Sequence, residues 1–324
     1  MKKLLLILCV ISLSACSPNI ESDPKNPHAV IYVAIASHNE EPSLKQPDYL
    51  QSEEFFEEHR AGLVEWANML HDEGVLYNWQ SDWNFLQAIQ EYDQGSPETN
   101  GKNVAVWMEE DLGFETNPHA HESKYSYADV NYLMEAIGLD PVAIVGGFLA
   151  APVSDSKVDY LNKPVDGLVY DTTWTAEALW GGGTGLHINE EGLWASGIWR
   201  PASAADFFTN DPNSIPNIGN YSSDWEGLSK LIELNENGEL DPNKIYTITI
   251  MNDQKNFIEE GYIEDFRTEI EKFQAYAEDG TLAWVTLSQM LEIWEEDYNS
   301  EPNLLHYNEE AAQSIFEKTF KKKF

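Results

Sequence analysis

Residues 29–37, AVIYVAIAS, are the stretch of sequence that decides the fold. They are apolar and rich in β-branched residues without strict alternation, which is the pattern of a strand buried on both faces. Strands of this kind belong to parallel sheets that are covered by helices. The stretch runs directly into the polar segment Ser37-His38-Asn39-Glu40-Glu41. We therefore expect a buried parallel strand whose C-terminal end carries chemically useful side chains.

The rest of the chain alternates between helical and extended patterns. Residues 53–74 have apolar positions near helical spacing, with Gly74 placed as a C-cap. The pattern predicts further strands over 75–80, 104–108, 141–149, 245–251 and 281–286, less regular ones over 167–173 and 192–199, and helices over 83–92, 127–137, 222–234 (capped by Ser222 or Ser223), 258–278 and 288–298. Such alternation implies right-handed parallel crossovers. The sequence predicts an α/β fold, with residues 28–324 forming a single β/α barrel of seven or eight strands, regular or distorted.

The first residues are typical of an exported bacterial lipoprotein. Lys2 and Lys3 precede the apolar residues 4–13. This segment is the length of a signal-peptide core, whereas a membrane-spanning helix needs about 20 residues. Leu13-Ser14-Ala15-Cys16 resembles the lipobox of bacterial lipoproteins, which implies cleavage before Cys16 and lipid attachment to its thiol. We expect a signal peptide over residues 1–15 and a lipidated tether over residues 16–27.

The residue after the predicted lipidation site bears on location. Ser17 stands where an inner-membrane retention signal would place Asp, which favours an outer-membrane lipoprotein facing the periplasm or the cell exterior. Membrane contact would then be made through the N-terminal lipid only. We expect the protein to be a monomer.

Composition excludes several kinds of site and partner. The chain has 19 Lys and Arg against 56 Asp and Glu, a formal net charge of −37. A field of this sign repels nucleic acid and anionic lipid headgroups. Of the two cysteines, Cys9 would leave with the signal peptide and Cys16 would be acylated. The mature protein would then lack disulfides, zinc-thiolate sites and a cysteine nucleophile.

Polar clusters follow the predicted strands, where the active site of a β/α barrel lies. They occupy residues 37–41, 109–111 and 117–122. Imidazole and carboxylate together suit a divalent metal ion, with Zn as the first candidate and Mn, Fe or Ni as alternatives. His119 and His121 would point the same way in extended backbone. The predicted metal ligands are His38, Glu40, Asp111, His119 and His121. The alternative is that the two histidines cap a loop and the acids are surface charge.

The sequence resembles the glycoside hydrolase/deacetylase β/α-barrel superfamily, which includes the NodB-type polysaccharide deacetylases. The resemblance rests on the opening strand with its polar loop, the later histidine pair, and the closing segment 280–287 (GTLAWVTL) followed by Met290, Leu291 and Trp294. Two motifs differ. Ala36-Ser37-His38-Asn39-Glu40 replaces the usual Thr-Phe-Asp-Asp, and His119-Ala120-His121 replaces the usual His-x-x-x-His.

The resemblance implies a metal-dependent hydrolase that acts on a carbohydrate, with deacetylation as the first candidate reaction. A bound ion would polarise the carbonyl and acidify a water molecule. Glu110 and Glu122 are the candidate bases, and His187 is the candidate to protonate the leaving group or to stabilise the oxyanion. Trp174, Trp180 and Trp199 lie near the glycine-rich residues 181–185, and their rings would suit a glycan substrate if they are exposed. Burial in the core is the alternative for these rings.

Two other functions stay open at this point. A metal-independent glycoside hydrolase would use two carboxylates about 5 to 10 Å apart. An inactive barrel would serve as a lipid-anchored glycan-binding protein.

Overall fold

The computed structural model describes residues 28–121, 123–146, 161–181, 195–203 and 206–307. The predicted signal peptide, the tether and Cys16 lie outside these residues. The helices are α1 (Glu53–Asp72), α2 (Trp83–Tyr92), α3 (Val104–Glu110), α4 (Tyr127–Ala136), α6 (Trp225–Glu236), α7 (Tyr262–Glu278) and α8 (Leu287–Glu296), with 3-10 turns η1 (Pro97–Thr99) and η2 (Gln254–Ile258). The strands outside the two main sheets are β5 (Val165–Asp166), β6 (Thr173–Trp174), β8 (Ala195–Ser196) and β13 (Leu305–His306).

The first main sheet is parallel and is organised around β1 (Ile31–His38). Its order is β11 (Tyr246–Asp253), β1, β2 (Tyr77–Ser81) and β3 (Glu115–Pro118). A further strand, β12 (Leu282–Trp284), pairs with the beginning of β1, while β2 pairs with its end. Two strands therefore share one edge of β1. Strand β12 pairs with residues 31–33 and β2 pairs with residues 35–38, so the strand order departs from that of a regular barrel.

A second sheet completes a distorted barrel. Its order is β4 (Ile144–Gly146), β7 (Ala178–Trp180), β10 (Asn217–Ile218) and β9 (Ile198–Trp199), and only β9 is antiparallel to its neighbour. The two sheets meet where Val142 N donates to Thr116 O at 2.8 Å. They meet again where the Thr247 hydroxyl donates to the carbonyl oxygens of Gly197 and Gly219 at 3.1 and 2.7 Å.

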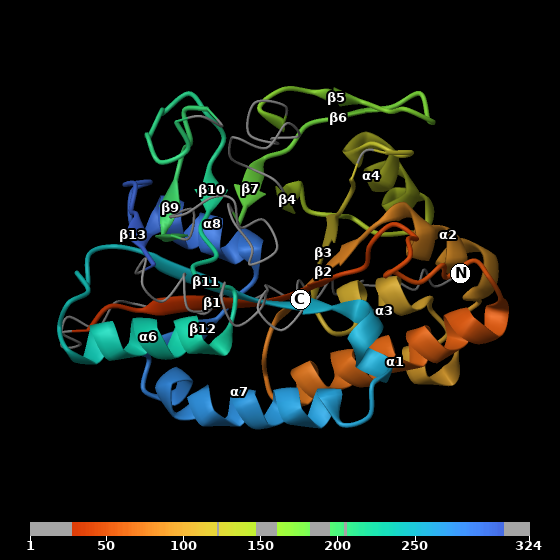
Figure 1. The fold of residues 1–324 in the computed structure, drawn as a ribbon, viewed down its shortest axis with the longest axis horizontal. Coiled ribbons are helices and arrows are strands. Elements are labelled where there is room, and N and C mark those ends of the chain that lie inside the picture. The colour runs from red at the N-terminus through yellow and green to blue at the C-terminus, as the bar shows by residue number, and fades with distance from the viewer. Residues whose placement is uncertain (1–27, 122, 147–160, 182–194, 204–205, 308–324) are drawn as a thin grey trace, which may run out of the picture.

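The side chains of β1 confirm that this strand is buried on both faces. Ile31, Val33 and Ile35 belong to a core that they share with α1, α6 and α7. Tyr32, Ala34 and Ala36 belong to a second core, between the two sheets and α8. Figure 1 shows α1, α6 and α7 on one side of β1 and β11, and the β4–β7–β10–β9 sheet on the other. The fold class predicted from the sequence is thereby confirmed.

Element boundaries differ from the prediction in a few places. The strand predicted over residues 104–108 is wrong, because this segment is α3 and the third strand is β3, further along the chain. Short apolar runs fit either structure, and here the Asn103 side chain caps a helix by accepting from Val106 N at 2.9 Å. Helix α6 begins at Trp225 and is capped by Asp224 rather than by a serine. Most of residues 167–173 is the turn between β5 and β6.

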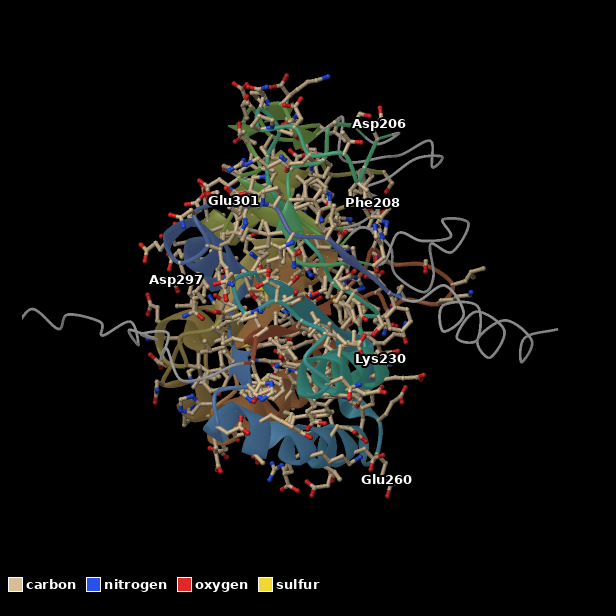
Figure 2. All side chains as sticks on the ribbon, turned by 90° about the vertical axis from the view of Figure 1, so that its left-hand side faces the viewer. Asp206, Phe208, Lys230, Glu260, Asp297 and Glu301 are labelled. Carbon is tan, nitrogen blue, oxygen red and sulfur yellow. The ribbon has the colours of Figure 1, made fainter. Side chains whose placement is uncertain are left out.

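Acidic side chains are found all around the surface. Figure 2 shows Glu260, Asp297 and Glu301 at the periphery of the molecule. Among the described residues, no helix is both long enough and apolar enough to cross a membrane.

Candidate metal centre

The site lies where β1 and β3 end. His38 is the last residue of β1, and Glu40 follows two residues later. His119 comes directly after β3. Backbone hydrogen bonds continue beyond the strands, with Asn39 N donating to Gln80 O at 3.2 Å and His119 N donating to Ser81 O at 2.9 Å. Strand β2 therefore holds both loops in place, and the parallel arrangement brings their side chains together.

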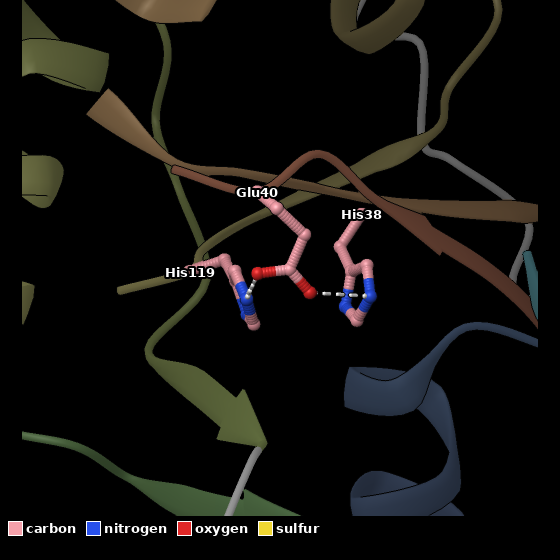
Figure 3. Close-up of side chains that lie close together, drawn as sticks. All are labelled: His38, Glu40 and His119. Atoms are coloured by element: carbon pink, nitrogen blue, oxygen red, sulfur yellow. Dashed lines mark hydrogen bonds and ion pairs between the residues drawn. The ribbon is translucent and has the colours of Figure 1, made fainter. Parts of the chain in front are cut away.

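Glu40 lies between the histidines. Its Oε1 is 3.0 Å from Nε2 of His38, and its Oε2 is 3.4 Å from Nε2 of His119. His121 also contacts Oε2 through its own Nε2. Figure 3 shows the carboxylate between the imidazoles of His38 and His119. One ligand atom from each of these three residues lies within 4.8 Å of the other two.

The donor set fits a divalent transition metal. Two imidazoles and a carboxylate, with a third imidazole beside them, are the ligands that Zn, Mn, Fe and Ni accept in proteins. Nε2 of His119 and Nε2 of His121 lie 3.2 Å apart. At this distance the two nitrogens either form an N–H···N hydrogen bond, with the proton on one ring, or both face a cation. His38, Glu40 and His119, three of the predicted ligands, thus converge, and His121 lies beside them.

Burial and charge set the protonation states of the cluster. Burial alone would raise the pKa of Glu40, but the imidazoles of His119, His121 and His38 hold it well below its usual range. Burial, aided by the charge of His38, lowers the pKa of His119 to about 4, although Glu40 opposes this effect. At neutral pH Glu40 is therefore anionic and His119 neutral, which are the forms that bind metal.

Asp253 is a neighbour of the cluster that the sequence reasoning missed. It is the last residue of β11 and is paired in register with His38. Its Oδ1 is 3.5 Å from His38 Nε2, and its Oδ2 is 3.0 Å from Lys255 Nζ. Burial would lower the pKa of His38, but the hydrogen bonds to Asp253 and Glu40 outweigh burial and raise it to about 9. Polar residues directly after the predicted strand 245–251 were the signal for this position.

Asp82 is a second missed residue. It follows β2 and is fully buried, and its carboxylate oxygens form no well-aligned hydrogen bond. Burial, together with the negative charge of Glu41, raises the pKa of Asp82 to about 8, although the nearby N–H groups of Trp83 and Asn84 oppose the rise. The Asp82 carboxyl is therefore mostly protonated at pH 7 and ionises as the pH rises through its pKa of about 8. Its position after the predicted strand 75–80 was the available signal.

The side chain of Asn39 ties the site together. It is buried, and its Nδ2 donates to Ser81 Oγ at 3.2 Å and to Gln254 Oε1 at 3.0 Å. Its Oδ1 accepts from Asp82 N at 2.9 Å. The residues that follow β1, β2 and β11 are thus fixed to one another, which favours a preorganised site.

The structure does not bring Glu110 and Asp111 to this cluster. Because residues 104–110 form a helix, both acids fall at its C-terminal end, where Lys102 pairs with them. Glu110 Oε2 is 2.7 Å from Lys102 Nζ, and Asn100 donates to Asp111 at 2.7 Å. Glu122 and His187 lie outside the described residues.

Two of the three predicted substrate-binding tryptophans are core residues. Trp180 is buried, and its Nε1 donates to Thr249 Oγ1 at 2.7 Å. Trp199 is fully buried and donates to Phe207 O at 2.7 Å. Neither ring is available to a sugar. The alternative of burial in the core is therefore correct for both tryptophans. Trp174 is half-buried and stacks on Tyr127 with ring centroids 6.0 Å apart.

Comparisons with known proteins find a likeness in structure alone. No protein-family model and no curated protein matches the chain. A probable polysaccharide deacetylase from Pseudomonas aeruginosa PAO1 is similar over 86% of this chain and 96% of that chain, with 13% sequence identity and a TM-score of 0.50. The Puue allantoinase is similar over 85% of this chain and 94% of that chain, with 10% identity and a TM-score of 0.50. At such identities the likeness establishes a shared α/β fold.

Proposed function

We propose that this protein is a metal-dependent hydrolase that removes an acyl group from a carbohydrate. The observation that carries the proposal is the Glu40 carboxylate, whose side chain is 17% exposed, with His38, His119 and His121 gathered around it at the ends of β1 and β3. The structural likeness to a protein described as a probable polysaccharide deacetylase supports the choice of a carbohydrate substrate.

The metal would be held by His38, Glu40 and His119, with His121 as a further ligand. Zn is the first candidate, and Mn, Fe and Ni are the alternatives. When bound, the ion would polarise the acyl carbonyl and lower the pKa of a water molecule. Hydrolysis would form a bond between the water oxygen and the acyl carbon and break the bond from that carbon to the sugar nitrogen or oxygen. One proton of the water would pass to the leaving amine or alcohol.

Asp253 is our candidate to take up the proton of the attacking water. Of the described carboxylates, it and Glu40 are the two that pair with a histidine of the cluster. The Asp253 side chain is 36% exposed, so it lies at the open side of the site. Glu122 and His187 stay predicted contributors to proton transfer. Glu110 is no longer a candidate base, because its partner is Lys102.

Metal analysis of the purified protein tests this function. We expect about one transition metal ion per chain and release of acetate from acetylated oligosaccharides that stops with chelator and returns with Zn. His119→Ala should lose the metal and the activity, and His71→Asn, at an exposed position of α1, is the matched control. Turnover without metal and insensitive to chelator would point to a metal-independent glycoside hydrolase. Oligosaccharide binding without any turnover would point to a glycan-binding protein.

Lipid attachment at Cys16 forms a separate part of the proposal. The lipobox-like residues 13–16 support it. Expression in a bacterium with labelled fatty acid should label the protein, and Cys16→Ala should abolish the label. Equal labelling of both forms would contradict it.

A further inference from the structure

A cavity lies between α8 and the residues that lead into the strands of the second sheet. Its volume is about 530 Å³, which is within the range of small-molecule binding sites. Glu177 and Pro216, which line it, come directly before β7 and β10, and Leu291 and Glu295 line it from α8. Figure 1 shows α8 beside β9 and β10. The cavity therefore lies where strands begin, whereas the metal centre lies where β1 and β3 end.

Strand β3 separates the cavity from the metal centre. Ser288 lines the cavity, and its backbone N–H donates to Glu115 Oε2 at 3.1 Å. Glu115 is the first residue of β3, and His119 follows the last one. Four residue steps of extended chain place these two positions about 13 Å apart. None of the four residues of the metal cluster lines the cavity, so the two sites are distinct.

Arg200 lines the cavity with a guanidinium that is held in place. Its Nη1 donates to Ser214 O at 2.9 Å, and its Cζ lies 5.3 Å from the ring centroid of the buried Trp294. The backbone of Arg200 is fixed as well, because its N–H donates to Asn210 Oδ1 at 2.9 Å and its carbonyl oxygen accepts from Asp211 N at 2.8 Å. A binding group fixed in this way loses little freedom when a ligand pairs with it.

The positive charge of Arg200 has no counter-ion in the described part of the chain. The arginines that form ion pairs there are Arg60 and Arg267. Of the five N–H groups of a guanidinium, a single one has an acceptor among the described residues. The hydroxyl of Ser214, which also lines the cavity, has no hydrogen-bond partner among them either. A guanidinium pairs best with a carboxylate or a phosphate, so Arg200 offers a site for a ligand anion.

Three carboxylates of the opposite charge line the same cavity. Glu177, Glu292 and Glu295 are exposed, and none of them forms an ion pair among the described residues. Glu292 and Glu295 are three residues apart on α8 and are therefore neighbours on its surface. These acids would repel a ligand that is purely anionic, and Arg200 would repel one that is purely cationic. Val142 and Ile144 add an aliphatic wall to the cavity.

We propose that this cavity binds a small zwitterion, namely a free amino acid or a short peptide with free ends. The ligand carboxylate would pair with Arg200, and the ligand ammonium would pair with Glu292 or Glu295. An apolar side chain of the ligand would lie against the aliphatic wall. This inference goes beyond the proposed function and does not rest on it, because no residue of the metal centre takes part.

Calorimetric titration with matched ligands tests the inference. The purified protein is first dialysed against phenanthroline, so that no metal can bind the ligand carboxylate. We expect L-leucine or L-leucyl-L-leucine to bind with a Kd below about 1 mM. The N-acetylated and the C-amidated forms of the same ligand should bind about tenfold more weakly or worse, because each lacks one of the two charges. Binding of leucine would assign the cavity to free amino acids, and binding of the dipeptide alone would assign it to peptides.

Two results with these ligands would overturn the inference. One is the absence of binding by both zwitterions. The other is an affinity for either blocked form that equals the affinity for its zwitterion, since one of the two charges would then play no part.

Variants of the cavity locate the binding site. Arg200→Gln should weaken binding of the zwitterion by about tenfold or more. Glu292→Gln combined with Glu295→Gln should weaken it by about threefold, because these side chains are exposed. Glu296→Gln is the matched control, since Glu296 is exposed on α8 and does not line the cavity. Should Arg200→Gln not fold, the variant of the two exposed acids decides. Unchanged affinity in the cavity variants, or an equal loss in Glu296→Gln, would overturn the inference.

Discussion

Two clusters of acids in this protein look alike in sequence and differ in structure. Glu40 lies in a run of polar residues after a strand, and Glu110 with Asp111 lies in another polar run. Glu40 is mostly buried among three imidazoles. Glu110 is 54% exposed and is neutralised by Lys102. Local acidity is common to both clusters, so the convergence of parallel strand ends is what places Glu40, and not Glu110, among the imidazoles of the proposed metal site.

The largest expected effect contrasts the two clusters directly. Glu40→Gln keeps the shape of the side chain and removes the charge that His38 and His119 share. We expect the affinity for Zn to fall by about a hundredfold or more, since loss of even outer-sphere partners costs 10- to 100-fold. Glu110→Gln is the matched control and should bind Zn like the wild type. Competition with a chromophoric chelator measures both affinities, and equal affinities in the two variants would contradict the role of Glu40 as a metal ligand.

Asp82 gives the next largest effect, on stability. The pKa of Asp82 is about 8 in the folded protein, against an ordinary value of 3.8 for the unfolded chain. Between these two pH values the carboxyl must take up a proton on folding, and the free-energy cost of this uptake grows as pH rises toward 8. Asp82→Asn should therefore stabilise the protein at pH 7 by roughly 2 kcal/mol, because the variant takes up no proton at this position on folding. The gain should vanish near pH 4. Urea unfolding at both pH values checks this, and a gain that is the same at both would contradict the burial argument.

Protons compete with the metal for the imidazole of His38. Its pKa of about 9 means that the imidazole is protonated at pH 7 in the metal-free protein. Metal binding must displace this proton, so Zn affinity should rise about tenfold per pH unit from 7 toward 9 and then level off. Asp253→Asn removes a partner that raises the pKa and should flatten the slope. A slope that persists unchanged in this variant would show that Asp253 does not control the protonation of His38.

The smallest effect is expected at the exposed cluster. Lys102→Met removes both ion pairs to Glu110 and Asp111. Exposed pairs contribute little to stability, so the melting temperature and the Zn content should match the wild type. A loss of metal in this variant would mean that the exposed acids belong to the site after all.

Particular residues show how far the sequence could predict this molecule. The apolar stretch before His38 and the His119-Ala120-His121 pair identified two of the strand ends that meet, because burial on both faces and side-chain alternation are local properties. Residues 104–108 were misjudged, because a five-residue apolar run fits a helix as well as a strand. Asp253 and Asp82 were missed because their roles depend on the register of β11 and β2 against β1. Burial of Trp180 and Trp199 likewise depends on packing between sheets.

We propose that His38, Glu40 and His119 together hold one metal ion. Anomalous diffraction at the zinc edge from crystals grown with Zn tests it most directly. We expect a single strong peak about 2 Å from Nε2 of His38, from a Glu40 carboxylate oxygen and from Nε2 of His119. A peak beside Glu110 and Asp111 instead, or none at the ends of β1 and β3, would contradict the claim.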